Sequence, residues 1–379
     1  MIVTRAQLEQ HEEECLAVYG LKSRDSRGRQ NPEEEPLYRT AFQRDRDRIV
    51  HSAAFRRLEY KTQVFVNDAG DYYRTRLTHT LEVAQIGRTV ARALGANEDL
   101  VEAICLAHDL GHAPFGHAGE DSLNSVMQAH GGFNHNAQSF RVVTTLEVRY
   151  PGWQGLNLTL EALEGIAKHE AARDLSGLMG LDPKTRGSLE AQIANIVDEL
   201  AYSAHDLDDG LLSGLLIPAQ LEELEVWRTL CDRLDWHGTQ LDEVMRHRFI
   251  RELVGMLVDD LLTVTDVRIQ ALNPRSSNDI TTQPDNIVKF SDEIWSMSRK
   301  LKKFLYANMY FHPSVISMAR RADRIIVALF ESYIEEPRQL PKLWQVRLER
   351  DGLHRTVADY IACLTDRSAT AEYQRMYAR

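Results

Sequence analysis

The sequence predicts a nearly all-α protein with at most one small β-hairpin. Apolar residues recur at helical spacing through most of the 379 residues, and strand-type alternation is confined to 63–66 and 72–74, on either side of a turn at 67–71. Hydrophobic residues make up 43% of the chain, which is enough for a large globular core. We expect three parts: an N-terminal arm at 1–38, a main domain at 39–335 and a C-terminal helical extension at 336–379.

Helical periodicity defines the elements of the main domain. Between His79 and Leu94, apolar side chains stand at positions 83, 86, 90 and 94. A second apolar face ends at Ala107 and leads directly into His108. The same pattern predicts further helices at 156–168, 189–207, 221–270, 284–306 and 313–335. The charged arm at 1–38 is expected to be a linker or a frayed segment, and 171–188 is expected to be a loop.

Composition and charge exclude several classes of protein. The net charge of −11 argues against a protein that coats nucleic acid, although a local basic cluster could still bind an anionic substrate. The four cysteines lie far apart and form no CxxC pair, which is typical of a reducing compartment. The N-terminus has no apolar signal core, and no apolar run is long enough to span a bilayer. We therefore expect a cytoplasmic protein without a membrane partner.

The most informative segment is HDLGHAPFGHAGE at 108–120. It places three imidazoles and two carboxylates within thirteen residues, and its glycines and proline break the helical pattern so that side chains can gather around one point. A single histidine is usually a satisfied structural residue. The whole set is instead typical of an active site built on a divalent metal.

A divalent metal needs about four to six ligands from converging elements. His79 opens one helix, and the pair His108-Asp109 follows the next. Asp198 is the best distant candidate, because it shares one stripe of its helix with Tyr202 and Asp206 at four-residue spacing. We expect Mg²⁺ or Mn²⁺ first, and Fe, Co, Ni or Zn are also compatible with this donor set, whereas calcium would need more oxygen ligands.

Longer segments resemble one enzyme family. The order His79, His108-Asp109, Asp198 matches the pattern of HD-domain phosphohydrolases. The dGTPase-like deoxynucleoside triphosphate (dNTP) triphosphohydrolases have segments similar to RDRDRI (44–49), AFRRL (54–58), KTQVF (61–65), RLTHT (76–80), 108–120, 156–159, 163–165 and 198–210. The resemblance covers about residues 39–335 and implies an all-α HD-domain fold.

The resemblance assigns roles near the metal. The implied metal ligands are His79, His108, Asp109 and Asp198. His117 and Glu120 match a catalytic histidine and its carboxylate partner, and a histidine held in this way can transfer a proton near neutral pH. His112 matches a pocket histidine of some members, and we rank it below His117. Asn134 stands where many relatives have glutamate, which leaves Glu120 as the expected proton partner.

The resemblance also implies substrate contacts at Arg57, Lys61, Gln63, Arg76, Tyr202, Asp206 and Tyr310. The permanent charge and planar fork of Arg76 suit a polyphosphate. An aromatic ring at Tyr202 would leave no space for a 2′-hydroxyl, and Asp206 could accept a hydrogen bond from a 3′-hydroxyl. The alternatives are a core Tyr202, a surface Asp206 and a self-paired solvated helix at 44–48. We expect the acidic pair at 208–209 to be solvated at a helix end.

The sequence therefore predicts a metal-dependent hydrolase that converts a dNTP into a deoxynucleoside and inorganic triphosphate. The alternatives are an HD-type nucleotidase of other specificity and a non-hydrolytic nucleotide sensor or single-strand-binding protein that uses the same pocket. By resemblance, the expected partners are the dNTP substrate, a dNTP effector at a separate site, single-stranded DNA and further copies of the chain in a homo-oligomer.

Overall fold

The computed structural model describes residues 2–63, 73–169, 175, 177, 180 and 183–377. The all-α prediction is confirmed, because helices dominate this part of the chain and its only isolated strand-type pairings are two antiparallel bridges, Arg29 with Thr159 and Thr62 with Thr75. Most of the predicted hairpin, 64–72, and much of the predicted loop at 171–188 lie outside the described residues.

The chain divides into two compact units. The first unit contains Met1–Arg46, Leu81–Cys105 and Thr159–Pro313. Its helices are α1 (Arg5–Cys15), η1 (Ser23–Asp25), most of α2 (Ala41–Val50), most of α4 (Arg76–Leu94), most of α5 (Glu98–Ala107), α8 (Leu160–Ala167), α9 (Leu189–Leu212), α10 (Pro218–Leu221), α11 (Glu225–Leu234), α12 (Glu243–Leu272), α13 (Ser277–Thr281), α14 (Asp292–Leu305) and the π-turn η8 (Tyr306–Tyr310).

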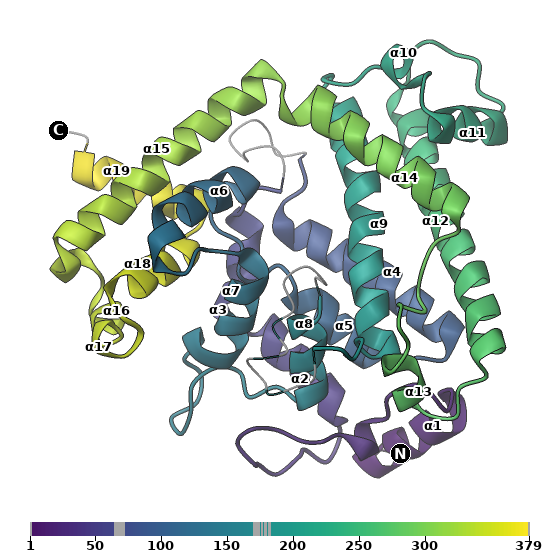
Figure 1. Ribbon diagram of the computed structural model, residues 1–379, viewed down its shortest axis with the longest axis horizontal. Coiled ribbons are helices and arrows are strands. Elements are labelled where there is room, and N and C mark those ends of the chain that lie inside the picture. Colours follow the sequence, from purple (N-terminus) through teal and green to yellow (C-terminus); the bar gives the residue numbers. More distant parts are fainter. Residues whose placement is uncertain are drawn as a thin grey trace. The chain divides into compact units, whose positions relative to one another are not determined.

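Helix α9 is the central element of the first unit, with α12 and α14 packed beside it (Figure 1). Each of these three long helices begins at a side chain that caps it. Ser188 accepts a hydrogen bond from the amide of Ala191 at the start of α9, and Asp242 and Ser291 accept equivalent bonds at the starts of α12 and α14. The predicted helix at 189–207 is thereby confirmed and extends to Leu212.

The second unit contains Asp47–Thr80, Leu106–Leu158 and Ser314–Arg379. Its helices are α3 (Ala53–Arg57), η2 (Leu58–Tyr60), the first turn of α4, α6 (Gly116–Met127), η4 (Gln128–His130), α7 (His135–Arg141), the π-turn η5 (Val142–Leu146), α15 (Pro313–Glu335), η9 (Pro337–Gln339), α16 (Lys342–Gln345), α17 (Leu348–Asp351), α18 (Leu353–Ala362) and α19 (Asp366–Tyr377). The helix predicted at 313–335 is confirmed as α15.

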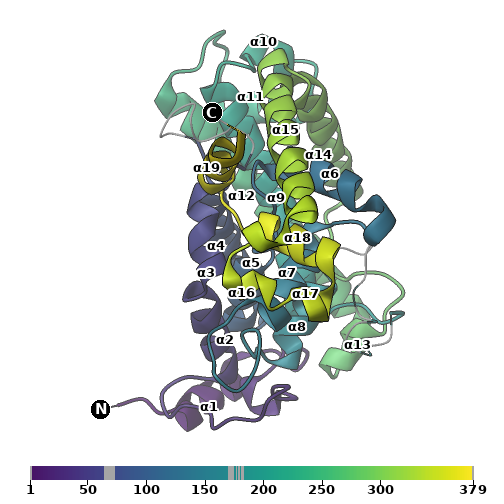
Figure 2. The same cartoon turned by 90° about the vertical axis from the view of Figure 1, so that its left-hand side faces the viewer.

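One apolar core joins the elements of the second unit. Leu123 and Met127 of α6 are fully buried together with Ile326 and Leu329 of α15 and Ile361 of α18. Figure 2 shows α18 and α19 next to α15, where they contribute to this core. The C-terminal helices therefore pack on α6, the helix that carries part of the predicted site.

Two predictions about the elements are corrected. The segment expected to be a linker or frayed arm contains α1, whose Glu12 accepts hydrogen bonds from both the amide and the hydroxyl of Ser23. The helix expected at 221–270 is interrupted between α11 and α12, because Asp235 adopts a left-handed conformation with φ of 48° that ends α11. The predicted domain boundaries at 38 and 335 do not coincide with those of the units and stay predictions. Among the described residues, no helix combines the length and apolarity needed to cross a bilayer.

Candidate active site

Most of the predicted site residues lie in the second unit, on three stretches of chain at 57–63, 76–79 and 108–120. The first turn of α4 carries Arg76 and His79, and the turn after α5 carries His108 and Asp109. These four side chains are each at most 3% exposed. Such burial of charged and imidazole groups is costly unless they bind one another or a ligand, so the stretches require specific polar partners.

His79 and His108 face each other closely enough to share a ligand. Their ring centroids lie 5.7 Å apart, and a ring nitrogen of one lies within 4.8 Å of a ring nitrogen of the other. The carboxylate of Asp109 lies 3.4 Å from Nε2 of His108. Burial raises the pKa of Asp109, but the neighbouring His108, Arg76 and His112 outweigh it and hold the pKa well below its usual range. The two facing imidazoles are donors that suit a divalent transition metal, and an ionised carboxylate lies next to His108.

Asp198, the fourth predicted ligand, lies in the first unit on α9. Its carboxylate is 3.5 Å from Nε2 of His169, the residue two positions after the end of α8. Its assignment as a ligand of the same ion stays a prediction.

Arg76 is a buried guanidinium with unused hydrogen-bonding capacity. Its Nη1 donates to Asp109 at 3.0 Å, while its Nε and Nη2 find no hydrogen-bond partner among the described residues. The buried Oε1 of Gln63 also lacks a partner in that part of the chain. Buried donors are almost always satisfied in folded proteins, so the two nitrogens indicate a binding position for an anion beside Asp109.

Lys61 and Arg57 were predicted to contact the substrate, and the structure shows backbone contacts for Lys61. The ammonium group of Lys61 is fully buried and donates to the backbone carbonyls of His112 and, at 2.9 Å, Ala362. Burial lowers the pKa of Lys61 to about 8. Lys61 thus contacts the 108–120 loop, and half-buried Arg57 lies on α3, before η2. The substrate contacts of both residues stay predictions.

A second group of side chains forms around Glu120 of α6. Nδ1 of His135, the first residue of α7, lies 2.8 Å from the Glu120 carboxylate, and the ring of His112 stacks on that of His135 with centroids 4.0 Å apart. His117 is more distant, with Nδ1 3.8 Å from Glu120 and its side chain 47% exposed. Glu120 thus holds His135 directly, and the predicted pairing of Glu120 with His117 is the weaker contact.

The protonation of this group follows from its surroundings. Burial lowers the pKa of His112 well below its usual range, and the nearby charge of Arg76 lowers it further. Burial raises the pKa of Glu120, but the adjacent imidazoles of His117 and His135 more than offset it and keep the carboxyl ionised. Nδ1 of His112 has no hydrogen-bond partner among the described residues. A neutral imidazole beside a carboxylate–imidazole pair can accept and return a proton.

His135 is the site residue that sequence reasoning missed. The segment containing it drew notice only because Asn134 replaces a glutamate of many relatives. In the structure Asn134 caps α7 by accepting a hydrogen bond from the amide of Ala137 at 3.1 Å, which fixes His135 in the first turn. The sequence did contain a signal for His135, because it directly follows a residue typical of a helix N-cap in a segment that resembles the family.

Two glycines explain how the loop packs so closely. A Cβ atom at Gly111 would lie 2.1 Å from the amide nitrogen of Ser139 on α7, so only glycine permits this approach. A Cβ atom at Gly119 would lie 1.9 Å from the carbonyl oxygen of Pro114. The loop and α7 are held together by a hydrogen bond of 2.9 Å from the Gly111 amide to the hydroxyl of Ser139.

The residues predicted to recognise a sugar meet in the first unit. The hydroxyl of Tyr310 donates to Oδ2 of Asp206 at 2.8 Å and contacts the hydroxyl of Tyr202. Burial raises the pKa of Asp206 to about 7, and its buried Oδ1 finds no partner within the described part of the chain. The π-turn η8 positions Tyr310 for this contact. The structure thus brings the three residues together and leaves one carboxylate oxygen available.

Two readings of charged segments are corrected. In the 44–48 segment, which could have been a self-paired helix, Arg44 instead pairs with Glu33 at 2.7 Å and Asp45 is fully buried. The acidic residues 208–209, expected to be solvated, are both buried, and Asp208 binds Arg246. Arg44 and Asp208 thus form ion pairs with other parts of the first unit.

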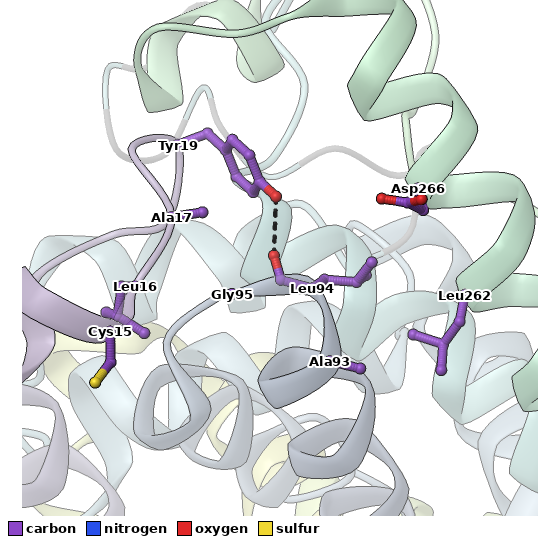
Figure 3. A pocket seen from close by; sticks show the side chains of 9 residues that line it. All are labelled: Cys15, Leu16, Ala17, Tyr19, Ala93, Leu94, Gly95, Leu262 and Asp266. Atoms are coloured by element: carbon purple, nitrogen blue, oxygen red, sulfur yellow. Dashed lines mark hydrogen bonds between the residues drawn. The ribbon is translucent and has the colours of Figure 1, made fainter.

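A cavity in the first unit is lined by other residues than these. It has a volume of about 370 Å³ and is lined by Cys15, Tyr19, Leu94, Asp266 and their neighbours (Figure 3). The hydroxyl of Tyr19 already donates to the carbonyl of Leu94 at 3.0 Å. No residue predicted to act on a substrate lines this cavity.

The chain matches two family models. The model described as an HD domain matches residues 76–203, a range that contains all four predicted metal ligands, and a model of a phosphohydrolase-associated domain matches residues 288–375. A deoxyguanosinetriphosphate triphosphohydrolase-like protein of Geobacter sulfurreducens is 50% identical over 365 residues, which cover 96% of this chain and 95% of that relative.

Two further relatives carry the same description. The protein of Nitrosomonas europaea is 49% identical over 369 residues, which cover 96% of this chain and 98% of that relative. The protein of Brucella suis is 45% identical over 384 residues, with 96% of each chain covered. The chain therefore belongs to the HD-domain family of deoxyguanosinetriphosphate triphosphohydrolase-like proteins.

Proposed function

We propose that the protein hydrolyses a dNTP to a deoxynucleoside and inorganic triphosphate. One observation carries the proposal. The buried guanidinium of Arg76 lies beside Asp109 and near the facing imidazoles of His79 and His108, and two of its nitrogens find no partner among the described residues. An anion-binding donor next to a metal-type donor set supports a phosphohydrolase. The names of the relatives support dGTP or another dNTP as the substrate class.

We propose that His79, His108, Asp109 and Asp198 hold one divalent ion. When bound, such an ion supplies charge stabilisation for phosphoryl oxygens and lowers the pKa of a coordinated water. Mg²⁺ and Mn²⁺ are the first candidates, and Fe, Co, Ni or Zn would also suit the imidazole-rich donors.

The residues around Glu120 are proposed to move the protons of the reaction. Water adds to the α-phosphorus, the bond from phosphorus to the 5′ oxygen of the sugar breaks, and that oxygen takes up a proton as the deoxynucleoside leaves. Glu120 fixes the tautomer of His135, and His135, His112 or His117 is then available to transfer a proton at the reacting oxygens. Arg76 binds the polyphosphate as its charge increases.

We propose that Tyr202, Asp206 and Tyr310 select the sugar. The unpartnered Oδ1 of Asp206 supports a hydrogen bond from a 3′-hydroxyl, and the ring of Tyr202 would oppose a 2′-hydroxyl. By family resemblance we also propose a homo-oligomer, a dNTP effector site and binding of single-stranded DNA. The cytoplasmic location stays a prediction.

The decisive experiment incubates the metal-replete protein with each of the four dNTPs and the matching ribonucleotides, with Mn²⁺, with Mg²⁺ and with chelator. Release of triphosphate and deoxynucleoside from at least one dNTP, abolished by chelator, is the expected result. Release of monophosphate or pyrophosphate would indicate a nucleotidase or a pyrophosphohydrolase. Binding without turnover under every metal condition would indicate a nucleotide sensor.

A further inference from the structure

A single buried carboxylate connects two parts of the candidate active site. Asp366, the first residue of α19, is 5% exposed. Its Oδ1 accepts a hydrogen bond of 2.7 Å from the amide of Phe115, in the loop that leads into α6. Its Oδ2 accepts from the amide of Thr62 at 2.9 Å and from the hydroxyl of the same residue. All these residues belong to the second unit.

The carboxylate of Asp366 is not needed to begin its own helix. Thr365 caps α19, because its hydroxyl accepts from the amide of Ser368 at 3.1 Å and its amide donates to the hydroxyl of Ser368 at 2.7 Å. An acidic residue in the first helical turn commonly serves that helix end. Here the side chain is directed at the loop and at Thr62 instead.

The loop position that Asp366 binds has an unfavourable backbone conformation. Phe115 has φ of 66° and ψ of 24°, a left-handed conformation that is rare for a residue with a side chain, and Gly116 follows with φ of 62°. Such conformations persist only where the surrounding contacts over-determine them. The hydrogen bond to Asp366 and the burial of the Phe115 ring in the apolar core are those contacts.

The loop conformation determines where α6 begins, and therefore how two site residues are presented. Gly116 is the first residue of α6, which then carries His117 and Glu120. A Cβ atom at Gly116 would lie 3.3 Å from the carbonyl oxygen of Gln63, so the turn is packed directly on the segment that Asp366 also binds.

The other side of the connection leads to Arg76. Thr62 forms an antiparallel bridge with Thr75, and the amide of Arg76 donates to the carbonyl of Lys61 at 3.2 Å. Lys61 adds a second link, because its ammonium group donates to the carbonyls of His112 and Ala362. Ala362 and Asp366 thus contact the Lys61–Gln63 segment, which is hydrogen-bonded to Arg76, and Asp366 also binds the loop that leads to Glu120.

We infer that Asp366 is a positioning residue, which sets the spacing between the His112–Phe115 loop and the Lys61–Gln63 segment and so orients Glu120 relative to Arg76. Its hydrogen bonds go to Phe115 and Thr62, neither of which is a predicted metal ligand or substrate contact. Its kinetic consequence depends on the proposed function, whereas its effect on the loop does not. The matched region described as phosphohydrolase-associated, 288–375, contains Asp366 and would contribute this role to the site.

The test is Asp366→Asn, which keeps the size of the side chain but places an amide N–H against one of the two backbone donors. Hydrogen exchange in the peptides covering 112–119 and 61–63 should accelerate at least tenfold, with exchange in α15 unchanged. With the dNTP that the wild type hydrolyses best, kcat should fall about a hundredfold, with KM changed less than threefold.

The matched control is Glu372→Gln on the same helix. Glu372 accepts a hydrogen bond from Tyr333 at 2.9 Å and contacts no residue of the loop. The Glu372→Gln variant should keep kcat within twofold of the wild-type value and leave hydrogen exchange in the loop unchanged. Thr62→Val removes only the hydroxyl contact with Asp366, so its effects on loop exchange and on kcat should be smaller than those of Asp366→Asn. If Asp366→Asn does not fold, Thr62→Val provides the test.

Two results separate the possible failures. Unchanged exchange at 112–119 in a folded Asp366→Asn variant, or a uniform increase across α15, α18 and α19, would overturn the inference. If wild-type protein releases triphosphate from no dNTP, the proposed function fails, and the exchange measurements still decide whether Asp366 positions the loop.

Discussion

Glu120 binds Nδ1 of His135 at 2.8 Å, while Nδ1 of His117 lies 3.8 Å from the same carboxylate. The closer histidine is also stacked on His112, so three imidazoles share the surroundings of one carboxylate. A carboxylate fixes the tautomer of the histidine it binds. Glu120 therefore prepares His135, and the exposed His117 is left freer to reach a substrate.

His135→Asn should lower kcat for triphosphate release by about 10²- to 10⁴-fold, the range of a general acid–base contribution. The variant leaves Glu120 without its imidazole partner while keeping a polar side chain at the start of α7. His130→Asn is the control, because His130 is exposed and stacks on His354 away from Glu120. Turnover within threefold of wild type in His135→Asn would mean that His135 is structural.

Arg76→Lys should weaken binding of inorganic triphosphate at least tenfold, measured by calorimetry, because lysine lacks the planar fork of arginine. Arg76→Ala should also lower the free energy of unfolding by about 3–5 kcal/mol, since Asp109 would keep its buried charge without its guanidinium partner. Arg92 forms an ion pair with Glu98 and its side chain is 66% exposed, so Arg92→Lys should change neither quantity measurably. Equal triphosphate affinity in Arg76→Lys and wild type would remove the proposed phosphate contact.

Asp206 should make stability fall as the pH rises. Burial raises its pKa from 3.8 to about 7, with Asp209 also raising it and Tyr310, Tyr202 and Lys302 lowering it. Because the folded pKa exceeds the unfolded one, the contribution is fully present below pH 4 and is lost as the pH rises through 7. At roughly 1.4 kcal/mol per pKa unit, the free energy of unfolding should fall by about 4 kcal/mol over this pH range.

The measurement compares urea unfolding of wild type and Asp206→Asn at pH 5 and pH 8.5. The variant should be the more stable protein at both pH values, by a smaller margin at pH 5 than at pH 8.5, because the contribution of Asp206 is lost progressively between pH 4 and pH 7. A difference between them that does not depend on pH would show that Asp206 ionises normally in the folded protein.

Gly111→Ala should destabilise the second unit by about 1–3 kcal/mol or more, because the added methyl group would overlap the backbone of α7 at Ser139. Gly255→Ala is the matched control. It lies inside α12 with nothing within 4 Å of the added Cβ, so it should stabilise by about 0.5–1 kcal/mol. The measurement is the midpoint of thermal unfolding of both variants. Shifts of the two midpoints in the same direction and of similar size would contradict the prediction.

The fold was largely predictable because helical periodicity is a local property. The helices at 79–94, 189–207 and 313–335 are all present, with ends that differ by a few residues. Helix α1 escaped prediction because it buries no residue fully and is anchored by polar contacts such as Glu12 with Ser23. Periodicity of apolar residues carries no information about such a helix.

The candidate site was predictable in residue type and less so in pairing. The short motif placed His108, Asp109, His112 and Glu120 correctly in one neighbourhood, because their separation along the chain is small. The contact of Lys61 with Ala362 was not predictable, since its acceptor lies 301 positions away and no sequence pattern connects the two. Contacts between distant segments decide whether a buried cation serves a ligand or the fold.

Helix α9 is uninterrupted from Leu189 to Leu212 and carries Asp198, Tyr202 and Asp206 at four-residue intervals. Each interval corresponds to about 6 Å along the axis of a rigid rod. If Asp198 binds the ion and Asp206 the sugar, any sliding or bending of this rod displaces both groups together. Substitutions that retune discrimination against ribonucleotides by moving α9 should then alter metal affinity as well, so evolution could not adjust the two properties separately.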